Sequence, residues 1–198
     1  MTLELWNTFA TFGTFIVIAA TAIAALVQLR HARGSNQIAA MGELQDAAQT
    51  SEFVMAENWV ATQMAGKLED AEFRFQVVNR SARTPENDAL ISNSNKIGNY
   101  YEQVGVLVKN GLVDKDIALD LWAENAPFYW DLLAPITAMV RERFGASLWE
   151  NFEYFVVLSQ DWLSAHPTGA YPVGVRRIDL KNKWLEADRQ YAVSRAPA

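Results

Sequence analysis

The sequence predicts an all-α protein in which a single N-terminal transmembrane helix precedes an irregular antiparallel bundle of helices. An apolar segment without any charged side chain runs from Leu5 to Leu29. It is long enough to cross the hydrocarbon core of a bilayer, which is roughly 30 Å thick. After this segment, apolar residues recur at three- and four-residue spacing, the period of amphipathic helices. No stretch shows the sustained two-residue alternation that is typical of strands.

The N-terminal apolar segment has the features of a membrane anchor, assigned to residues 1–33. Trp6 stands near its start as an interfacial aromatic, and Arg30 and Arg33 follow its end. Because basic flanks are retained in the cytoplasm, we expect a single-pass protein of the inner (cytoplasmic) membrane with its N-terminus outside and its domain in the cytoplasm. The residues assigned to the anchor and its flanks are Trp6, Phe9, Phe12, Phe15, Ile16, Ile18, Ile23, Leu26, Arg30 and Arg33.

Two other interpretations of the apolar segment fit its residues less well. A cleaved signal peptide needs a basic region before the apolar run, whereas only the acidic Glu4 precedes this one. A helix of a soluble core would carry one apolar stripe, whereas here the apolar residues surround the whole circumference. The sequence therefore favours a retained anchor.

Residues 34–198 are expected to form one helical cytoplasmic domain. The Gly-Ser-Asn sequence at residues 34–36 should end the anchor, with Asn36 capping a new helix. A second amphipathic run passes through Met64, and a shorter helix is expected around residues 69–79.

A long helix and its hairpin partner are predicted at the centre of the domain. Thr84 followed by Pro85 has the pattern of a helix cap and a first-turn proline. The helix should end at Lys109 and Gly111, a basic residue and then a glycine. Asp114 should cap the next helix, so that the two helices form an αα-hairpin.

Another helix is expected to begin at Pro127. Ser147 and Glu150 then have the spacing of a capping box, which predicts the start of the following helix. Apolar residues occur on more than one face of that helix, so it should lie centrally in the bundle.

The C-terminal part is predicted to contain a loop and one more helix. Residues 166–174 include two prolines and two glycines, a composition typical of loops. The last helix is expected over residues 178–189, with Trp184 and Leu185 as its contacts.

The composition excludes several classes of protein. The chain has 198 residues, no cysteine and a formal net charge of −6 at pH 7. Without cysteine there can be no disulfide, thiolate nucleophile, Cys-based zinc site or iron–sulfur cluster. An acidic chain also lacks the electrostatic footprint of a nucleic-acid binder. No cofactor and no nucleic-acid partner are therefore expected.

An acidic cluster after the hairpin turn superficially resembles a calcium loop. Asp114, Asp116 and Asp120 nevertheless lack the central glycine and the alternating oxygen ligands of an EF-hand. Helix capping by Asp114 explains the cluster better.

Other catalytic or metal-binding patterns are scarce. Glu102, Glu124 and Glu153 could meet inside a bundle, but a di-iron site also needs a His three residues after a Glu, and the sequence has none. With only two histidines, a catalytic triad or a general base that uses His is not expected. No P-loop, dinucleotide or nucleophile-elbow motif occurs.

Aromatic residues are concentrated between residues 100 and 162. Such residues usually form cores, but neighbours such as Tyr129 and Trp130 cannot all point to one side of a helix. Trp130 and Trp149 are therefore expected to divide between the core and a surface that contacts a partner or ligand. The residues assigned to that surface are Tyr100, Tyr101, Trp122, Tyr129, Trp130, Trp149 and Phe152.

Several short motifs carry a resemblance to a known family. They are Asn99-Tyr100-Tyr101-Glu102, Gly105 with Leu107-Val108-Lys109, Gly111-Leu112-Val113-Asp114, Tyr129-Trp130, Arg141 and Trp149-Glu150-Asn151-Phe152-Glu153. In these motifs and in its layout the chain resembles a family of bacterial membrane-anchored proteins known only as a domain of unknown function. The resemblance implies a spanning helix followed by a helical domain, and it brings no catalytic residues.

These features together predict a non-enzymatic accessory or interaction protein that belongs to a larger membrane complex. Its expected partners are the lipid bilayer and one or more proteins of that assembly. Two alternatives stay open: a ligand-sensing regulatory domain with an aromatic pocket between helices, and a membrane-bound enzyme whose carboxylates no motif reveals.

Overall fold

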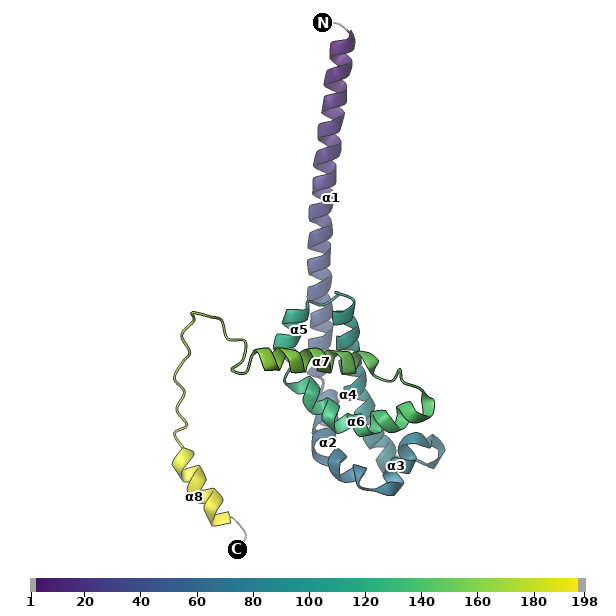
Figure 1. The fold of residues 1–198 in the computed structure, drawn as a ribbon, viewed down its shortest axis with the longest axis vertical. Helices are drawn as coiled ribbons and strands as arrows, with labels where there is room; N and C mark the ends of the chain where they lie inside the picture. Colours follow the sequence, from purple (N-terminus) through teal and green to yellow (C-terminus); the bar gives the residue numbers. More distant parts are fainter. Residues whose placement is uncertain (1–2, 196–198) are drawn as a thin grey trace. The chain divides into compact units, whose positions relative to one another are not determined.

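The computed structural model describes residues 3–195, apart from the side chains of residues 4, 5, 8–10 and 193. Every regular element in this part of the chain is helical, which confirms the all-α prediction. The chain divides into two compact units, Met1–Pro167 and Thr168–Ala198. The first unit holds the long N-terminal helix and the bundle (Figure 1).

Helix α1 (Leu3–Ala48) runs without a break for 46 residues (Figure 1). The helix break predicted at residues 34–36 is therefore wrong, and Asn36 lies inside the helix instead of capping a new one. The physical reason is tertiary contact. Beyond residue 34, one side of α1 is shielded by the bundle at three- and four-residue spacing, and Leu44 is buried there. A glycine inside a helix costs about 1 kcal/mol, which this packing offsets.

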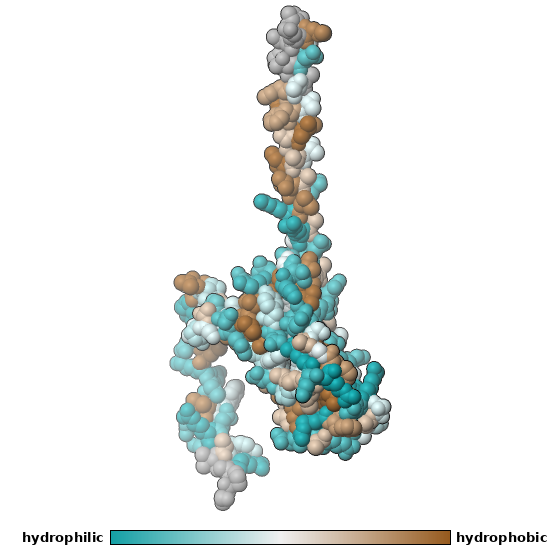
Figure 2. All heavy atoms as spheres, turned by 45° about the vertical axis from the view of Figure 1, so that its right-hand side comes forward, coloured by the Kyte–Doolittle hydropathy of each residue, from teal (hydrophilic) through white to brown (hydrophobic). Residues whose placement is uncertain are grey.

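The first part of α1 is long and apolar enough to cross a membrane, and none of that apolar window is buried within the protein. Figure 2 shows a mostly apolar surface along this part of the helix. The predicted anchor residues with described side chains are all exposed: Trp6, Phe12, Phe15, Ile16, Ile18, Ile23, Leu26, Arg30 and Arg33. The side chain of Phe9 lies outside the described part.

The bundle is arranged around one central helix, α4. Its elements are α2 (Ser51–Leu68), α3 (Ala71–Val78), a short 3-10 helix η1 (Arg80–Ala82), α4 (Pro85–Lys109), α5 (Lys115–Trp122), α6 (Asn125–Phe144) and α7 (Glu150–Ala165). Helix α4 contacts α2, α5, α6 and α7 (Figure 1). The core around it includes Phe73, Ile97, Val104, Leu133 and Phe155.

The two caps predicted for the central hairpin are confirmed. The Thr84 hydroxyl accepts a hydrogen bond from the Asn87 N–H at 3.3 Å. The Asp114 carboxylate accepts hydrogen bonds from the N–H groups of Asp116 and Ile117 at 3.0 and 3.2 Å. Each side chain thus satisfies N–H groups that a first helical turn leaves unpaired.

The start of α7 differs from the prediction. The capping box assigned to Ser147 and Glu150 is wrong, because the residue at the cap position is Trp149, whose side chain makes no capping hydrogen bond. The backbone of Trp149 has a φ of 53°, in the left-handed region, which is uncommon for a bulky residue. The first N–H groups of α7 are satisfied by a side chain of α4 instead.

The described residues of the second unit contain one helix, α8 (Leu185–Arg195). It begins later than the helix predicted over residues 178–189. The side-chain oxygen of Asn182 accepts a hydrogen bond from the Trp184 N–H at 2.9 Å, a local turn that competes with an earlier helix start. Within this unit, Trp184 and Leu185 are exposed.

Candidate functional site

The most extensive contact between two helices joins α4 to α7. A Cβ atom at Gly98 would collide with the indole of Trp149, and one at Gly105 would collide with the backbone carbonyl of Asn151. Glycine at these two positions therefore permits the close approach of the helices. We call this contact the α4–α7 joint. Its residues are Gly98, Asn99, Glu102, Gly105, Lys109, Trp149, Asn151 and Phe152.

The Glu102 carboxylate caps α7 from across the joint. It accepts hydrogen bonds from the backbone N–H of Asn151 at 3.0 Å and from that of Phe152 at 2.8 Å. Its other oxygen accepts a bond from the Asn151 side-chain amide at 2.7 Å. A carboxylate at this position satisfies unpaired N–H groups and lies at the positive end of the helix dipole. Glu102 therefore holds the N-terminus of α7 against α4.

Trp149 and Lys109 complete the joint. The Trp149 side chain is 2% exposed, and its indole N–H donates to the Asn99 side-chain oxygen at 3.0 Å. The Lys109 ammonium donates to the side-chain oxygen of Asn151 at 3.0 Å. Several residues of the short motifs noted in the sequence thus serve to dock one helix on another.

Arg141, near the end of α6, holds the segment that leads into the joint. Its Nε donates to the Leu148 carbonyl at 2.9 Å, and its Nη1 donates to the Glu153 carboxylate at 2.5 Å. The guanidinium also lies over the ring of Trp130, 5.8 Å from its centroid. Arg141 therefore connects α6 to both sides of the α7 start.

The predicted aromatic contact surface is instead part of the core. Helix α4 is covered by α2, α6 and α7, so a wide apolar arc can be buried without facing a partner. Trp130 is half-buried and packs edge-on against Phe152, with ring centroids 5.1 Å apart. The prediction of a surface is wrong for the six residues that are buried: Tyr100, Tyr101, Trp122, Tyr129, Trp149 and Phe152.

A half-buried carboxyl on α2, Glu57, lies among these phenols. Burial raises its pKa, and a hydrogen bond with the Tyr129 side chain partly opposes that rise. Burial likewise raises the pKa of Tyr100 to about 12, and it raises the pKa values of Tyr101 and Tyr129. The three phenols are therefore protonated near neutral pH, and the negative charge of Glu57 disfavours their ionisation further.

The carboxylates considered as metal ligands have other roles. Glu102 binds the N-terminus of α7, and Glu153 pairs with Arg141. Asp114 caps α5. Among the described residues, no three side chains of His, Asp or Glu are grouped as metal ligands would be.

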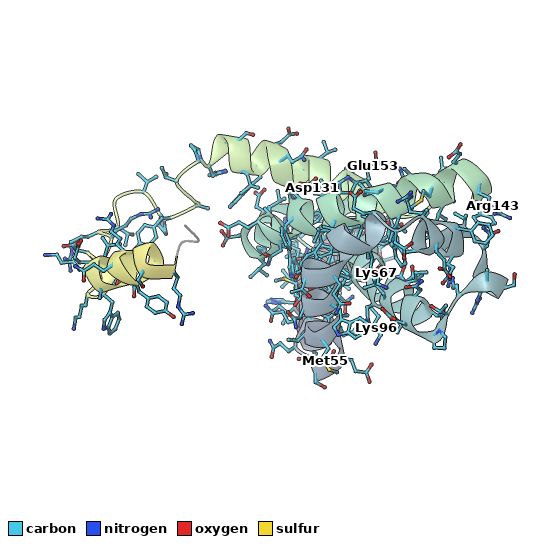
Figure 3. The ribbon with its side chains drawn as sticks, turned by 90° about the horizontal axis from the view of Figure 1, so that it is seen from below. Met55, Lys67, Lys96, Asp131, Arg143 and Glu153 are labelled. Atoms are coloured by element: carbon cyan, nitrogen blue, oxygen red, sulfur yellow. The ribbon has the colours of Figure 1, made fainter. Side chains whose placement is uncertain are left out.

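The outward sides of α6 and α7 carry a surface that the sequence analysis missed. Phe128 is 50% exposed, Tyr154 39% and Val157 52%. Figure 3 labels Asp131 and Glu153 on these two adjoining helices. We call this surface the α6–α7 outer face. Its exposed carboxylates are Asp131, Glu142, Glu150, Glu153 and Asp161. The sequence shows how the acidic residues are spaced along α7, but it does not show which sides of α6 and α7 the other helices leave uncovered.

Comparison with known proteins assigns the chain to a protein family. A family model described as a domain of unknown function (DUF4760) matches residues 15–159. The match begins within α1 and ends within α7, so it includes the α4–α7 joint. No curated protein and no solved structure matches the chain.

Proposed function

The chain belongs to the family described as a domain of unknown function (DUF4760), and from that premise we propose that it is a non-enzymatic, membrane-anchored accessory protein that binds a protein partner in a larger membrane complex. Its anchor crosses the inner (cytoplasmic) membrane with the N-terminus outside and the bundle in the cytoplasm. Arg30 and Arg33 support this orientation, because they directly follow the apolar segment.

The observation that carries the proposal is the composition of the α6–α7 outer face. Phe128 and Val157 are half-exposed apolar residues there. Asp131, Glu150 and Asp161 make no ion pair with any side chain in the described part of the chain. Exposed aromatic and apolar side chains within a polar rim are typical of protein interfaces. The partner that fits this face presents apolar side chains surrounded by Lys and Arg.

The residues of the α4–α7 joint and of the aromatic cluster are engaged internally. Glu102 and Trp149 hold the joint, and the aromatic cluster forms the core. The outer face combines half-exposed apolar side chains with the exposed, unpaired carboxylates of Asp131, Glu150 and Asp161. Electrostatic complementarity with a basic partner would speed association and select against acidic competitors.

The test compares two matched substitutions in the full chain. Val157 on the outer face and Val54 on α2 are both 52% exposed. We expect Val157→Lys to abolish recovery of the partner in a mild-detergent purification, because it places a cation within an acidic face. Val54→Lys should leave recovery unchanged, and both variants should keep the wild-type thermal midpoint.

A partner of the expected chemistry would have further properties. Its recovery should fall as salt rises from 0.1 M to about 1 M, where the Debye length shrinks from about 10 to about 3 Å. Equal recovery with Val157→Lys and the wild type would show that the outer face is not the binding surface.

A further inference from the structure

A hollow lies where α1 leaves the membrane-spanning segment and passes the turn between α4 and α5. It has a volume of about 400 Å³, within the range of small-ligand pockets. Its residues are Arg33, Asn36 and Gln37 of α1 and Asn110, Gly111 and Leu112 of the turn. We call it the membrane-proximal hollow.

The position of this hollow along α1 places it at the bilayer surface. The apolar segment ends at Leu29, and α1 continues as one helix through Arg33 and Gln37. At 1.5 Å per residue, Arg33 lies about 6 Å beyond the apolar edge. The headgroup layer on each side of a bilayer is roughly 5 to 8 Å thick. Because the helix is unbroken, the same height applies to the turn packed beside Arg33.

Two side chains in the hollow match the chemistry of that layer. Arg33 is exposed and makes no ion pair with any described side chain. Leu112 is 52% exposed, although its backbone is fixed: its N–H donates to the Leu107 carbonyl at 2.9 Å, and Gly111 before it has a φ of 65°. A rigid turn thus presents one apolar side chain beside an available guanidinium.

We propose that the membrane-proximal hollow receives a phospholipid headgroup, with Arg33 donating hydrogen bonds to the phosphodiester and Leu112 lying in the headgroup layer. Guanidinium binds phosphate oxygens well because its donors form a planar fork. A free phosphate ion would bind Arg33 but make no apolar contact with Leu112, whereas a phospholipid would contact both side chains. This contact brings the turn between α4 and α5 to the membrane surface.

The proposal rests on the proposed function only in requiring that α1 crosses the bilayer; it needs neither the protein partner nor the orientation. The chain has no cysteine, so single cysteines can carry an environment-sensitive fluorophore. Leu112→Cys reports on the hollow. Phe75→Cys on α3 is its matched control, since Phe75 is 57% exposed and α3 lies at the end of the bundle away from the spanning part of α1 (Figure 1). Ala20→Cys reports on the anchor.

The labelled full-length variants are reconstituted into phosphatidylcholine vesicles that contain lipids with a nitroxide on the headgroup or deep in the acyl chain. We expect headgroup quenching at position 112 to exceed that at position 75 severalfold. Acyl-chain quenching should be strong at position 20. Equal headgroup quenching at positions 112 and 75, with Ala20→Cys quenched, would overturn the lipid contact alone. If Ala20→Cys were not quenched, the anchor itself would be refuted.

A second substitution tests the role of the guanidinium. Combined with Leu112→Cys, Arg33→Gln should lower headgroup quenching, and Arg33→Lys should retain part of it. Unchanged quenching in Arg33→Gln would overturn the assignment of the phosphodiester to Arg33.

Discussion

Glu102 does for α7 what a local cap residue does for α4 and α5. Its carboxylate accepts N–H bonds from residues 49 and 50 positions away in the sequence. Hydrogen bonds to a charged group are worth roughly 1.5–3 kcal/mol, and the carboxylate also interacts favourably with the helix dipole. One side chain thus fixes the position of α7 on α4.

Replacement of Glu102 should therefore destabilise the bundle. We expect Glu102→Ala to cost about 2 kcal/mol, which for a domain of this size corresponds to a fall of about 4–8 °C in the thermal midpoint. Calorimetry of the full chain in detergent measures it. Asp131→Ala is the control, because Asp131 is exposed and unpaired among the described side chains. Identical midpoints for the two variants would contradict the capping role.

Glu57 should give the bundle a specific pH dependence. Burial raises the pKa of its carboxyl from the usual 4.5. In the pH range between the unfolded and the folded pKa, the folded state therefore holds more protons than the unfolded state. The stabilisation from protonated Glu57 is complete below the unfolded pKa and is lost as pH rises through the folded pKa.

The measurement is the thermal midpoint of the wild type and of Glu57→Gln at a series of pH values. From pH 4.5 upward, the wild type should lose stability relative to Glu57→Gln, which stays neutral throughout. Parallel profiles for the two proteins would show that the pKa of Glu57 is the same in both states.

The helices themselves show how far the sequence determines this fold. The starts of α4 and α5 could be predicted because Thr84 and Asp114 act on N–H groups within three residues of themselves. The start of α7 could not, because Glu102 lies on another helix. The break expected at residues 34–36 failed because the bundle packs against α1.

The candidate site was harder to predict than the helices. The apolar spacing around Tyr101 indicated a helix face correctly, but it could not show that several helices cover that face. The same limit applies to the outer face, where the exposure of Phe128 and Val157 depends on which sides of α6 and α7 pack inward. Whether a side chain is buried depends on how helices pack against one another, whereas apolar spacing in the sequence describes only one helix at a time.

Close approach in the α4–α7 joint makes its glycines sensitive to added volume. In Gly98→Ala the new Cβ collides with the buried indole of Trp149, so we expect a loss of about 1–3 kcal/mol from overpacking. Gly66→Ala on α2 is the matched control, because no atom lies within 4 Å of its Cβ. That control should keep or slightly raise the thermal midpoint, since alanine is the better helix former. Equal midpoints for both variants would contradict the close packing.

In the first unit, the apolar segment of α1 continues into the bundle as one helix, without a flexible linker. The helix that is apolar enough to cross a bilayer is the same helix that buries Leu44 in the core. With the anchor proposed above, this continuous helix would hold the bundle at a set height relative to the membrane and present the α6–α7 outer face to proteins of the same membrane.

The orientation of the anchor is a separate prediction at this scale. Because Arg30 and Arg33 follow the apolar segment, the C-terminus should lie in the cytoplasm. In a bacterial host, alkaline phosphatase fused to the C-terminus should be inactive, and green fluorescent protein at the same position should fluoresce. An active phosphatase fusion would reverse the assigned orientation.

Binding through the α6–α7 outer face is tested most directly by crosslinking in living cells. A photoreactive amino acid replaces Val157 in one full-length variant and Val54, equally exposed at 52%, in the other. We expect illumination to join position 157 to one protein through a segment rich in Lys, Arg and apolar residues, and position 54 to give no such product. Absence of a product at position 157, or the same product at both positions, would contradict it.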